Sequence, residues 1–188
     1  PRTSSAASGL RFCGMIDEPV ENLSLSFAKP KNGPVHSTIS SAKRDRCVAA
    51  MAEAVRSAMG APEILINCAA IVSDKLFLES DYADWTRMTE ICLYGPMNLI
   101  ANFAPAMVEK RYGRIICLAS DSARLGQARL SYYAAAKAGV IALCKSVAQE
   151  LGPSSVTVNV VSPGATNTTL RQAREESLLA QMGPENYA

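Results

Sequence analysis

Histidine is almost absent from this 188-residue sequence, in which His36 stands alone. A metal site built from histidine ligands is therefore disfavoured. No Cys-x-x-Cys pair occurs among the six cysteines, several of which lie in apolar segments. This distribution favours buried, reduced thiols over a disulfide framework, and it predicts a cytoplasmic protein.

A large excess of charge is also missing, since the formal net charge is +2 and no segment combines basic residues with interleaved aromatics. Nucleic-acid binding is therefore not indicated. We find no apolar run that approaches the length of a membrane-spanning helix, and residues 1–12 lack the apolar region of a secretory signal. These absences predict a protein that binds neither a membrane nor a nucleic acid.

What the sequence does contain is an ordinary globular composition, 48% hydrophobic and 19% charged, in a chain long enough for one domain. Short apolar runs alternate with longer helical patterns. Strands are expected at 35–39, 63–69, 114–120 and 155–163, and helices at 43–60, 81–113 and 131–152. Apolar strands that alternate with helices predict an α/β fold with a doubly wound parallel sheet.

The two ends of the chain differ from this core. Residues 1–34 are rich in Ser, Gly and Pro and show little periodicity, whereas residues 171–188 form one polar helical pattern. We therefore expect a single domain over 1–188, with an atypical N-terminal segment at 1–34 and a core at 35–170. The fold is expected to be incomplete at its N-terminal and C-terminal ends. The polar helix could cover a pocket as a lid or could simply be solvated.

The segment "SYYAAAKAG" (131–139) contains two adjacent tyrosines and a lysine. Tyr133 and Lys137 are four positions apart, so on a helix they share one face, whereas Tyr132 points elsewhere. Taken alone, the pattern fits a buried helix with one aromatic residue and one snorkelling lysine. It acquires a second interpretation only from its surroundings.

Those surroundings are three strand ends. Ser120 ends the strand "RIICLAS", the strand before it ends in "NCAA" from Asn67, and the strand after it ends in "SPGATNT" from Ser162. Carboxyl ends of parallel strands meet at one edge of the sheet, where ligands bind in open α/β folds. The sequence therefore predicts a site at this edge.

These residues together resemble the short-chain dehydrogenases/reductases. "SYYAAAKAG" is similar to the family's Tyr-x-x-x-Lys motif, Ser120 stands at the position of its catalytic serine, and "INCAA" resembles its Asn-Asn-Ala-Gly motif. "PGATNT" is similar to its Pro-Gly-x-x-x-Thr segment. The resemblance covers roughly residues 35–170 and is strongest to the 3-oxoacyl-thioester reductases.

The resemblance implies an NAD(P)-dependent oxidoreductase that interconverts a carbonyl and a secondary alcohol. Tyr133 would be the acid/base, its pKa lowered by the Lys137 ammonium and by an oxidised nicotinamide. Lys137 would also hold the nicotinamide ribose. Ser120 would donate a hydrogen bond to the substrate oxygen. The substrate would be a small carbonyl or alcohol, including an acyl thioester.

The same resemblance implies where the cofactor, NADP or NAD, would lie. Its expected contacts are Asn67, Ala69, Tyr133, Lys137, Pro163, Gly164 and Thr168. Gln127, on the loop between the serine and the tyrosine, would line the substrate site together with Ser120 and Tyr133. Lys29 and Lys31 could contact the 2′-phosphate of NADP and favour it over NAD. Lysines of a solvated loop would look the same in the sequence.

The sequence departs from the family's pattern at several places, and two of them bear on the site. Cys92 occupies the position of an asparagine that supports a water in a proton relay, and a thiol would do so poorly; it is interpreted as a buried small hydrophobe. The nearest match to the glycine-rich phosphate turn, "SSAASGLR" (4–11), keeps only Gly9, with Ser5 and Arg11 at the other glycine positions.

Three hypotheses therefore stay open: a fragment, a reductase with altered cofactor binding, or a non-catalytic relative that acts in binding or assembly. Family members form dimers or tetramers through two long helices, which correspond here to 81–112 and 131–151. The resemblance thus also implies a homo-oligomer.

Overall fold

The computed structural model describes residues 41–183. Several expectations lie outside these residues: the strand at 35–39, the phosphate-turn match at 4–11, and the two lysines Lys29 and Lys31. The structure therefore bears on the segment from Asn67 to Thr168 that holds the expected site residues, and not on the phosphate turn.

Three parallel strands form the sheet, in the order β1-β2-β3. They are β1 (Ile64–Asn67), β2 (Gly113–Leu118) and β3 (Val156–Val161). In the register, Ile116 of β2 lies beside Ile66 on one side and beside Asn159 on the other. Because each crossover between parallel strands contains a helix, the predicted parallel α/β class is confirmed.

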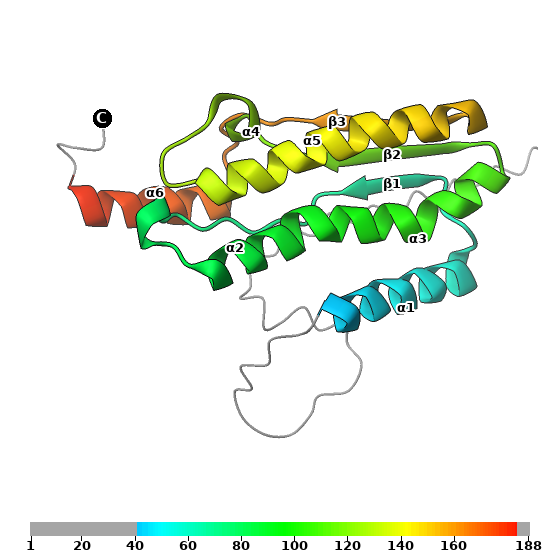
Figure 1. Cartoon of the computed structure of the whole chain (residues 1–188), viewed down its shortest axis with the longest axis horizontal. Helices are drawn as coiled ribbons and strands as arrows, with labels where there is room; N and C mark the ends of the chain where they lie inside the picture. The colour runs from blue at the N-terminus through cyan, green and yellow to red at the C-terminus, as the bar shows by residue number, and fades with distance from the viewer. Residues whose placement is uncertain (1–40, 184–188) are drawn as a thin grey trace, which may run out of the picture.

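The helices follow the expected segments closely. They are α1 (Ser41–Met59), α2 (Tyr82–Thr89), α3 (Gly95–Glu109), α4 (Ser122–Leu125), α5 (Ser131–Leu151) and α6 (Thr169–Met182), with short turns η2 (Phe77–Glu79), η3 (Glu90–Tyr94) and η4 (Gly152–Ser154). Helices α3 and α5 lie side by side over one face of the sheet, and α1 packs against α3 (Figure 1).

The long helix expected at 81–113 is interrupted in a way that the sequence analysis did not anticipate. A π-helical turn, η3, separates α2 from α3, and the N–H of Gly95 donates to the carbonyl of Glu90. Pro96 follows this turn in the first turn of α3, where its missing N–H is tolerated, while Pro105 lies inside α3. A π-turn therefore divides this helix just before Pro96.

The same helical run, Tyr82–Glu109, meets the length and composition of a membrane-spanning helix, with a mean hydropathy of 1.3. The sequence analysis missed this. Its buried residues recur at helical spacing on one side: Met88, Cys92, Pro96, Ile100, Phe103, Ala104 and Met107. This side packs in the core, and one helix that meets the length and composition criterion is weak evidence for a membrane span.

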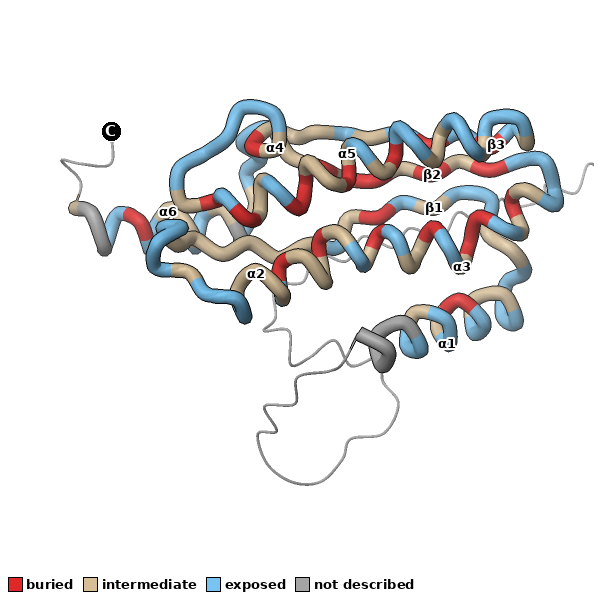
Figure 2. The backbone as a smooth tube through the Cα atoms, viewed as in Figure 1, coloured by how far each residue is buried: buried red, intermediate tan, exposed pale blue. Residues whose placement is uncertain are grey.

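The core lies between the sheet and the helices α3 and α5, along which buried segments recur (Figure 2). In β2, Ile115 and Cys117 are fully buried and alternate with partly exposed residues. Ile64 and Ile66 of β1 point to the opposite face of the sheet and are 56% and 42% exposed. Among the described residues, helices α3 and α5 therefore bury one face of the sheet and leave the second face open.

Candidate functional site

The three strand ends meet at the predicted edge. After β2 the chain continues through Ala119, whose N–H donates to the carbonyl of Val161 at 2.8 Å, and through Asp121, whose N–H donates to the carbonyl of Pro163 at 3.1 Å. These bonds extend the β2–β3 pairing past the strands and fix Ser120 between them. The turn at Pro163 is thereby held beside the serine.

Lys137 reaches this edge from α5. It is only 2% exposed, and its Nζ donates to the carbonyl of Leu118 at 2.6 Å, just below Ser120. Nζ lies 5.9 Å from the centroid of the Tyr133 ring. As helix geometry predicts, Tyr133 and Lys137 share one face of α5, and that face is turned toward the carboxyl end of β2.

Burial decides the proton affinities of both groups. Desolvation raises the pKa of the Tyr133 phenol above its ordinary value of 10.0, while an interaction with the Ser120 hydroxyl opposes this shift. Desolvation lowers the pKa of the Lys137 ammonium. We expected Lys137 to lower the pKa of Tyr133, but in the protein without cofactor the pKa is raised. Burial disfavours the phenolate more than the neighbouring groups stabilise it.

Ser120 is oriented by the short helix α4, which the sequence analysis missed. Its Oγ lies 2.8 Å from the Oγ of Ser122, and it accepts a longer bond of 3.3 Å from the N–H of Ser122. Ser122 is itself buried. A serine two positions after a strand-end serine was a signal available in the sequence, but nothing distinguished it from an ordinary loop hydroxyl.

Asn67 and Gly164 occupy the neighbouring strand ends. Asn67 is 3% exposed, and its Oδ1 accepts from the N–H of Ala69 at 3.2 Å, which fixes the turn that leaves β1. At Gly164, an added Cβ would lie 3.0 Å from Oδ2 of Asp121. The backbone at this position is therefore closely approached, and even a methyl group would crowd the carboxylate.

Two expected site residues, Thr168 and Gln127, make local contacts and do not join the group around Ser120. The Thr168 hydroxyl accepts from the N–H of Arg171 at 3.2 Å and caps α6. Gln127 is exposed, and its carbonyl accepts from the N–H of Leu130. Both lie on segments that adjoin the edge, but neither side chain is joined to Ser120 or Tyr133 by a described hydrogen bond.

Cys92 lies in the π-turn and is fully buried, as expected of a small hydrophobe. Its Sγ is 3.5 Å from the carbonyl of Ile71 and 3.6 Å from Sδ of Met88. Burial raises the pKa of this thiol, which therefore stays protonated at neutral pH. It is a poor substitute for an amide that would support a water.

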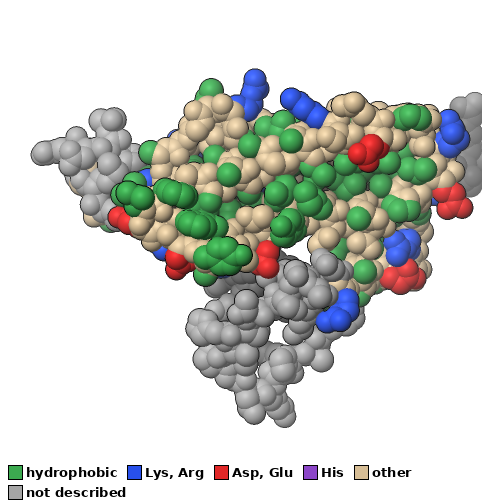
Figure 3. Space-filling model, in the orientation of Figure 1, with side chains coloured by type: hydrophobic (Ala, Val, Ile, Leu, Met, Phe, Trp, Pro, Cys, Tyr) green, Lys and Arg blue, Asp and Glu red, His purple; other side chains and the backbone are tan. Residues whose placement is uncertain are grey.

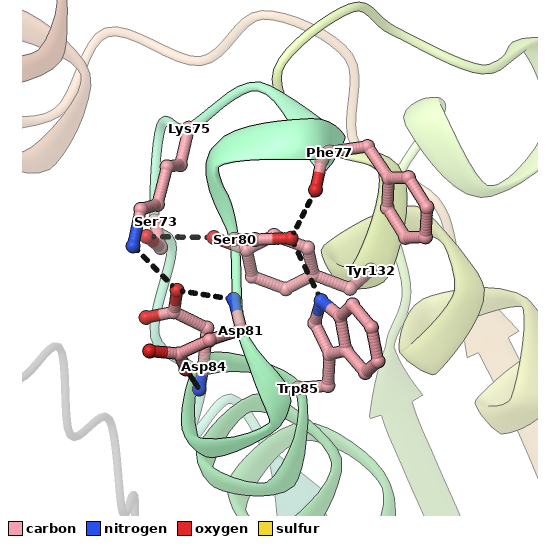
Figure 4. Close-up of polar contacts among 8 residues, drawn as sticks. All are labelled: Ser73, Lys75, Phe77, Ser80, Asp81, Asp84, Trp85 and Tyr132. Carbon is pink, nitrogen blue, oxygen red and sulfur yellow. Dashed lines mark hydrogen bonds and ion pairs between the residues drawn. The ribbon is translucent and has the colours of Figure 1, made fainter.

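Tyr132 is directed away from the carboxyl edge of the sheet. It is buried, and its hydroxyl donates to the Oγ of Ser73 at 2.9 Å (Figure 4). In the same region, Trp85 donates to Ser80 at 2.7 Å and stacks on Phe77 with ring centroids 5.5 Å apart. Tyr132 thus anchors the start of α5 to the segment that leads into α2, and this anchor leaves Tyr133 directed to the edge.

A second polar cluster beside the edge was not predicted. Asp74, on the loop after β1, pairs with Arg129 on the loop before α5 and with Arg174 on α6. The partners of Asp74 are 55 and 100 positions away in the chain. No local pattern could have paired them.

Apolar side chains gather on the outer face of α2, α3 and α5 (Figure 3). Two shallow grooves lie there. The first, of 370 Å³, is lined mainly by Phe77, Trp85, Thr89, Leu93, Tyr132 and Ala136. The second, of 380 Å³, is lined chiefly by Met97, Ile100, Ala104, Val108, Leu143 and Val147. Both are on the helical face and not at the carboxyl edge.

Comparison with known proteins identifies relatives of this chain. The family model described as short chain dehydrogenase matches residues 12–178. Nodulation protein G of Azospirillum brasilense is 37% identical over 129 residues, 69% of this chain and 52% of that protein. The 3-oxoacyl-(acyl-carrier-protein) reductase FabG of Escherichia coli (strain K12) is 36% identical over 134 residues, 69% of this chain and 55% of that protein.

A solved structure matches as well. The crystal structure described as ribose-5-phosphate isomerase from Brucella melitensis 16M superposes with a TM-score of 0.67 at 36% identity, over 71% of this chain and 52% of that chain. The chain spans about half the length of the curated relatives it matches. The family match extends over most of the sequence and includes the segments of all three strand ends. The chain therefore belongs to the short-chain dehydrogenase family, as the sequence motifs predicted.

Proposed function

We propose that the protein interconverts a carbonyl and a secondary alcohol by NAD(P)-dependent hydride transfer, with Tyr133 as the acid/base. The observation that carries the proposal is the arrangement at the carboxyl edge, where Ser120, Tyr133 and the buried Lys137 come together from β2 and α5. Similarity to oxidoreductases such as FabG supports the same reaction class.

The residues present fit a nicotinamide cofactor. A lysine ammonium has three donors, and Lys137, although buried, has one described acceptor, the carbonyl of Leu118. The remaining donors suit the ribose hydroxyls. Asn67 and Gly164 offer a fixed turn and a close backbone approach beside them, with Ala69, Pro163 and Thr168 on the same turns. The nicotinamide, when bound, supplies or accepts the hydride.

The chain's own residues perform the proton chemistry. In the reducing direction, Tyr133 gives its proton to the carbonyl oxygen, and its raised pKa keeps the phenol protonated until then. Ser120, held by Ser122, donates a hydrogen bond to the same oxygen and orients the carbonyl. The Lys137 ammonium stabilises the phenolate that remains. Gln127 adjoins the substrate side of this edge.

Binding of the cofactor tests the proposal directly. The purified chain is titrated with NADPH and with NADH, and nicotinamide fluorescence is followed. Saturable micromolar binding is expected, weakened at least about tenfold by Lys137→Met. Absence of binding to the folded chain would favour the non-catalytic alternative, a relative that acts in binding or assembly. The ratio of the two affinities decides between NADP and NAD.

We also propose that the chain forms a homo-oligomer through the outer face of α3 and α5. Met97 is exposed there and lines the second of the two apolar grooves on this face. Sedimentation equilibrium is expected to give a dimer or tetramer. Met97→Glu places a charge at an exposed position of the second groove and is expected to yield monomers without unfolding the chain, and a wild-type monomer would reject the proposal.

A further inference from the structure

The clearest polar cluster outside the catalytic groups is formed by one carboxylate and two arginines. Oδ1 of Asp74 pairs with Nε of Arg129, and Oδ2 pairs with Nε of Arg174 at 2.5 Å. All three side chains are largely buried, with exposures of 16%, 21% and 20%. Removing one partner of a partly buried ion pair leaves the other charge without its counter-charge, which costs more than the same change in a surface pair.

Each member of the cluster belongs to a different segment around the catalytic edge. Asp74 lies on the loop that leaves β1, Arg129 precedes α5 and its catalytic face, and Arg174 lies on α6, which follows the Pro163–Gly164 turn. The backbone reinforces the first link, because the N–H of Lys75 donates to the carbonyl of Arg129 at 3.1 Å. Arg129 has a φ of +67°, an unfavourable conformation for arginine that such links stabilise.

The pair with Asp74 joins helix α6 to a segment far away in the chain. The helix has 14 residues, a length at which an isolated helix is marginal in water. Arg174 and Leu178 are one turn apart and share a face, and Leu178 is buried. A second ion pair, Arg171–Glu175, lies within the helix and cannot attach it to anything else.

We propose that Asp74 is a positioning residue that holds α6 against the loop entering α5, by bonding Arg129 and Arg174 at once. Through this clamp it sets how substrate reaches Tyr133. The second statement rests on the proposed function, whereas the first does not. Asp74 touches none of the three groups assigned to the chemistry by any described contact, so its effect on catalysis is indirect.

Hydrogen exchange of the full 188-residue chain, read by mass spectrometry, tests the clamp without any turnover. Asp74→Asn and Arg174→Gln are each expected to raise the exchange rates of the α6 amides by about tenfold, with α5 and β2 unchanged. The double variant is expected to exchange no faster than Asp74→Asn alone, because Asp74→Asn already removes the contact with Arg174. Arg171→Gln is the matched control and is expected to change exchange about twofold or less.

Unchanged α6 exchange in Arg174→Gln, or effects of the two substitutions that simply add, would overturn the clamp. If Asp74→Asn fails to fold, Arg174→Gln decides alone, since it leaves the Asp74–Arg129 pair in place. In enzyme that turns over, both variants are expected to raise KM at least about fivefold with kcat within twofold. A loosened α6 with an unchanged KM would overturn the role in substrate access, whereas absence of turnover in the wild type would reject the proposed function and leave the clamp intact.

Discussion

The two faces of the sheet differ within residues 41–183. The face under α3 and α5 is closed, and Ile115 and Cys117 on it have no exposed area. The opposite face presents Ile64, Ile66 and Val161, each between two fifths and three fifths exposed. Strands that are apolar on both faces are typical of parallel sheets covered on both sides. The comparison teaches that the described contacts of Ser120, Tyr133 and Lys137 all come from the strand ends, α4 and α5, on the closed side of the sheet.

The largest expected effect concerns Tyr133, on the helix α5 that covers the closed face. Tyr133→Phe removes the hydroxyl that transfers the proton, and turnover is expected to fall by about 10²–10⁴-fold while the far-UV circular dichroism stays unchanged. Steady-state rates with NADPH and a carbonyl substrate measure this. Turnover within twofold of wild type would reject Tyr133 as the acid/base.

A pair of substitutions compares the two faces in stability. Ile115→Ala leaves a cavity in the closed face and is expected to reduce the free energy of unfolding by about 2–5 kcal/mol. Ile66→Ala on the open face is expected to cost less than about 1 kcal/mol. Urea unfolding of the 188-residue chain measures both. Equal costs would show that the second face is covered in solution.

Substitution of the adjacent Tyr132 is expected to have a smaller effect, on stability and not on turnover. Tyr132→Phe removes the hydrogen bond to Ser73 and is expected to reduce stability by about 1 kcal/mol with turnover nearly unchanged. Urea unfolding and steady-state kinetics of the same preparation separate the two readouts. A loss of turnover as large as that of Tyr133→Phe would mean that the two tyrosines have exchanged roles.

The smallest expected effect is a pH dependence. Because burial raises the pKa of Tyr133, the folded state holds this proton more tightly than the unfolded state. The resulting stability is present below the ordinary value of 10.0 and is lost as the pH rises through the raised pKa. Wild type is therefore expected to lose stability relative to Tyr133→Phe above pH 10, seen as diverging urea midpoints. Parallel midpoints from pH 8 to 11 would contradict the shift.

Much of this protein followed from its sequence, because the signals were local. Apolar runs and helical periodicity gave β2, β3 and α5 nearly to the residue. The four-residue spacing of Tyr133 and Lys137 placed both on one face, and parallel strands brought Ser120 to the same edge. Periodicity and strand direction are properties of short segments, so they can be read without the rest of the fold.

Only the tertiary structure decided the remainder. The hydrogen bond from Tyr132 to Ser73 joins residues 59 positions apart, and the pKa shifts of Tyr133 and Lys137 depend on how deeply α5 packs. The Asp74 clamp joins residues up to 100 positions apart. Burial and long-range pairing are set by how segments pack together, and no pattern within one segment records its distant neighbours.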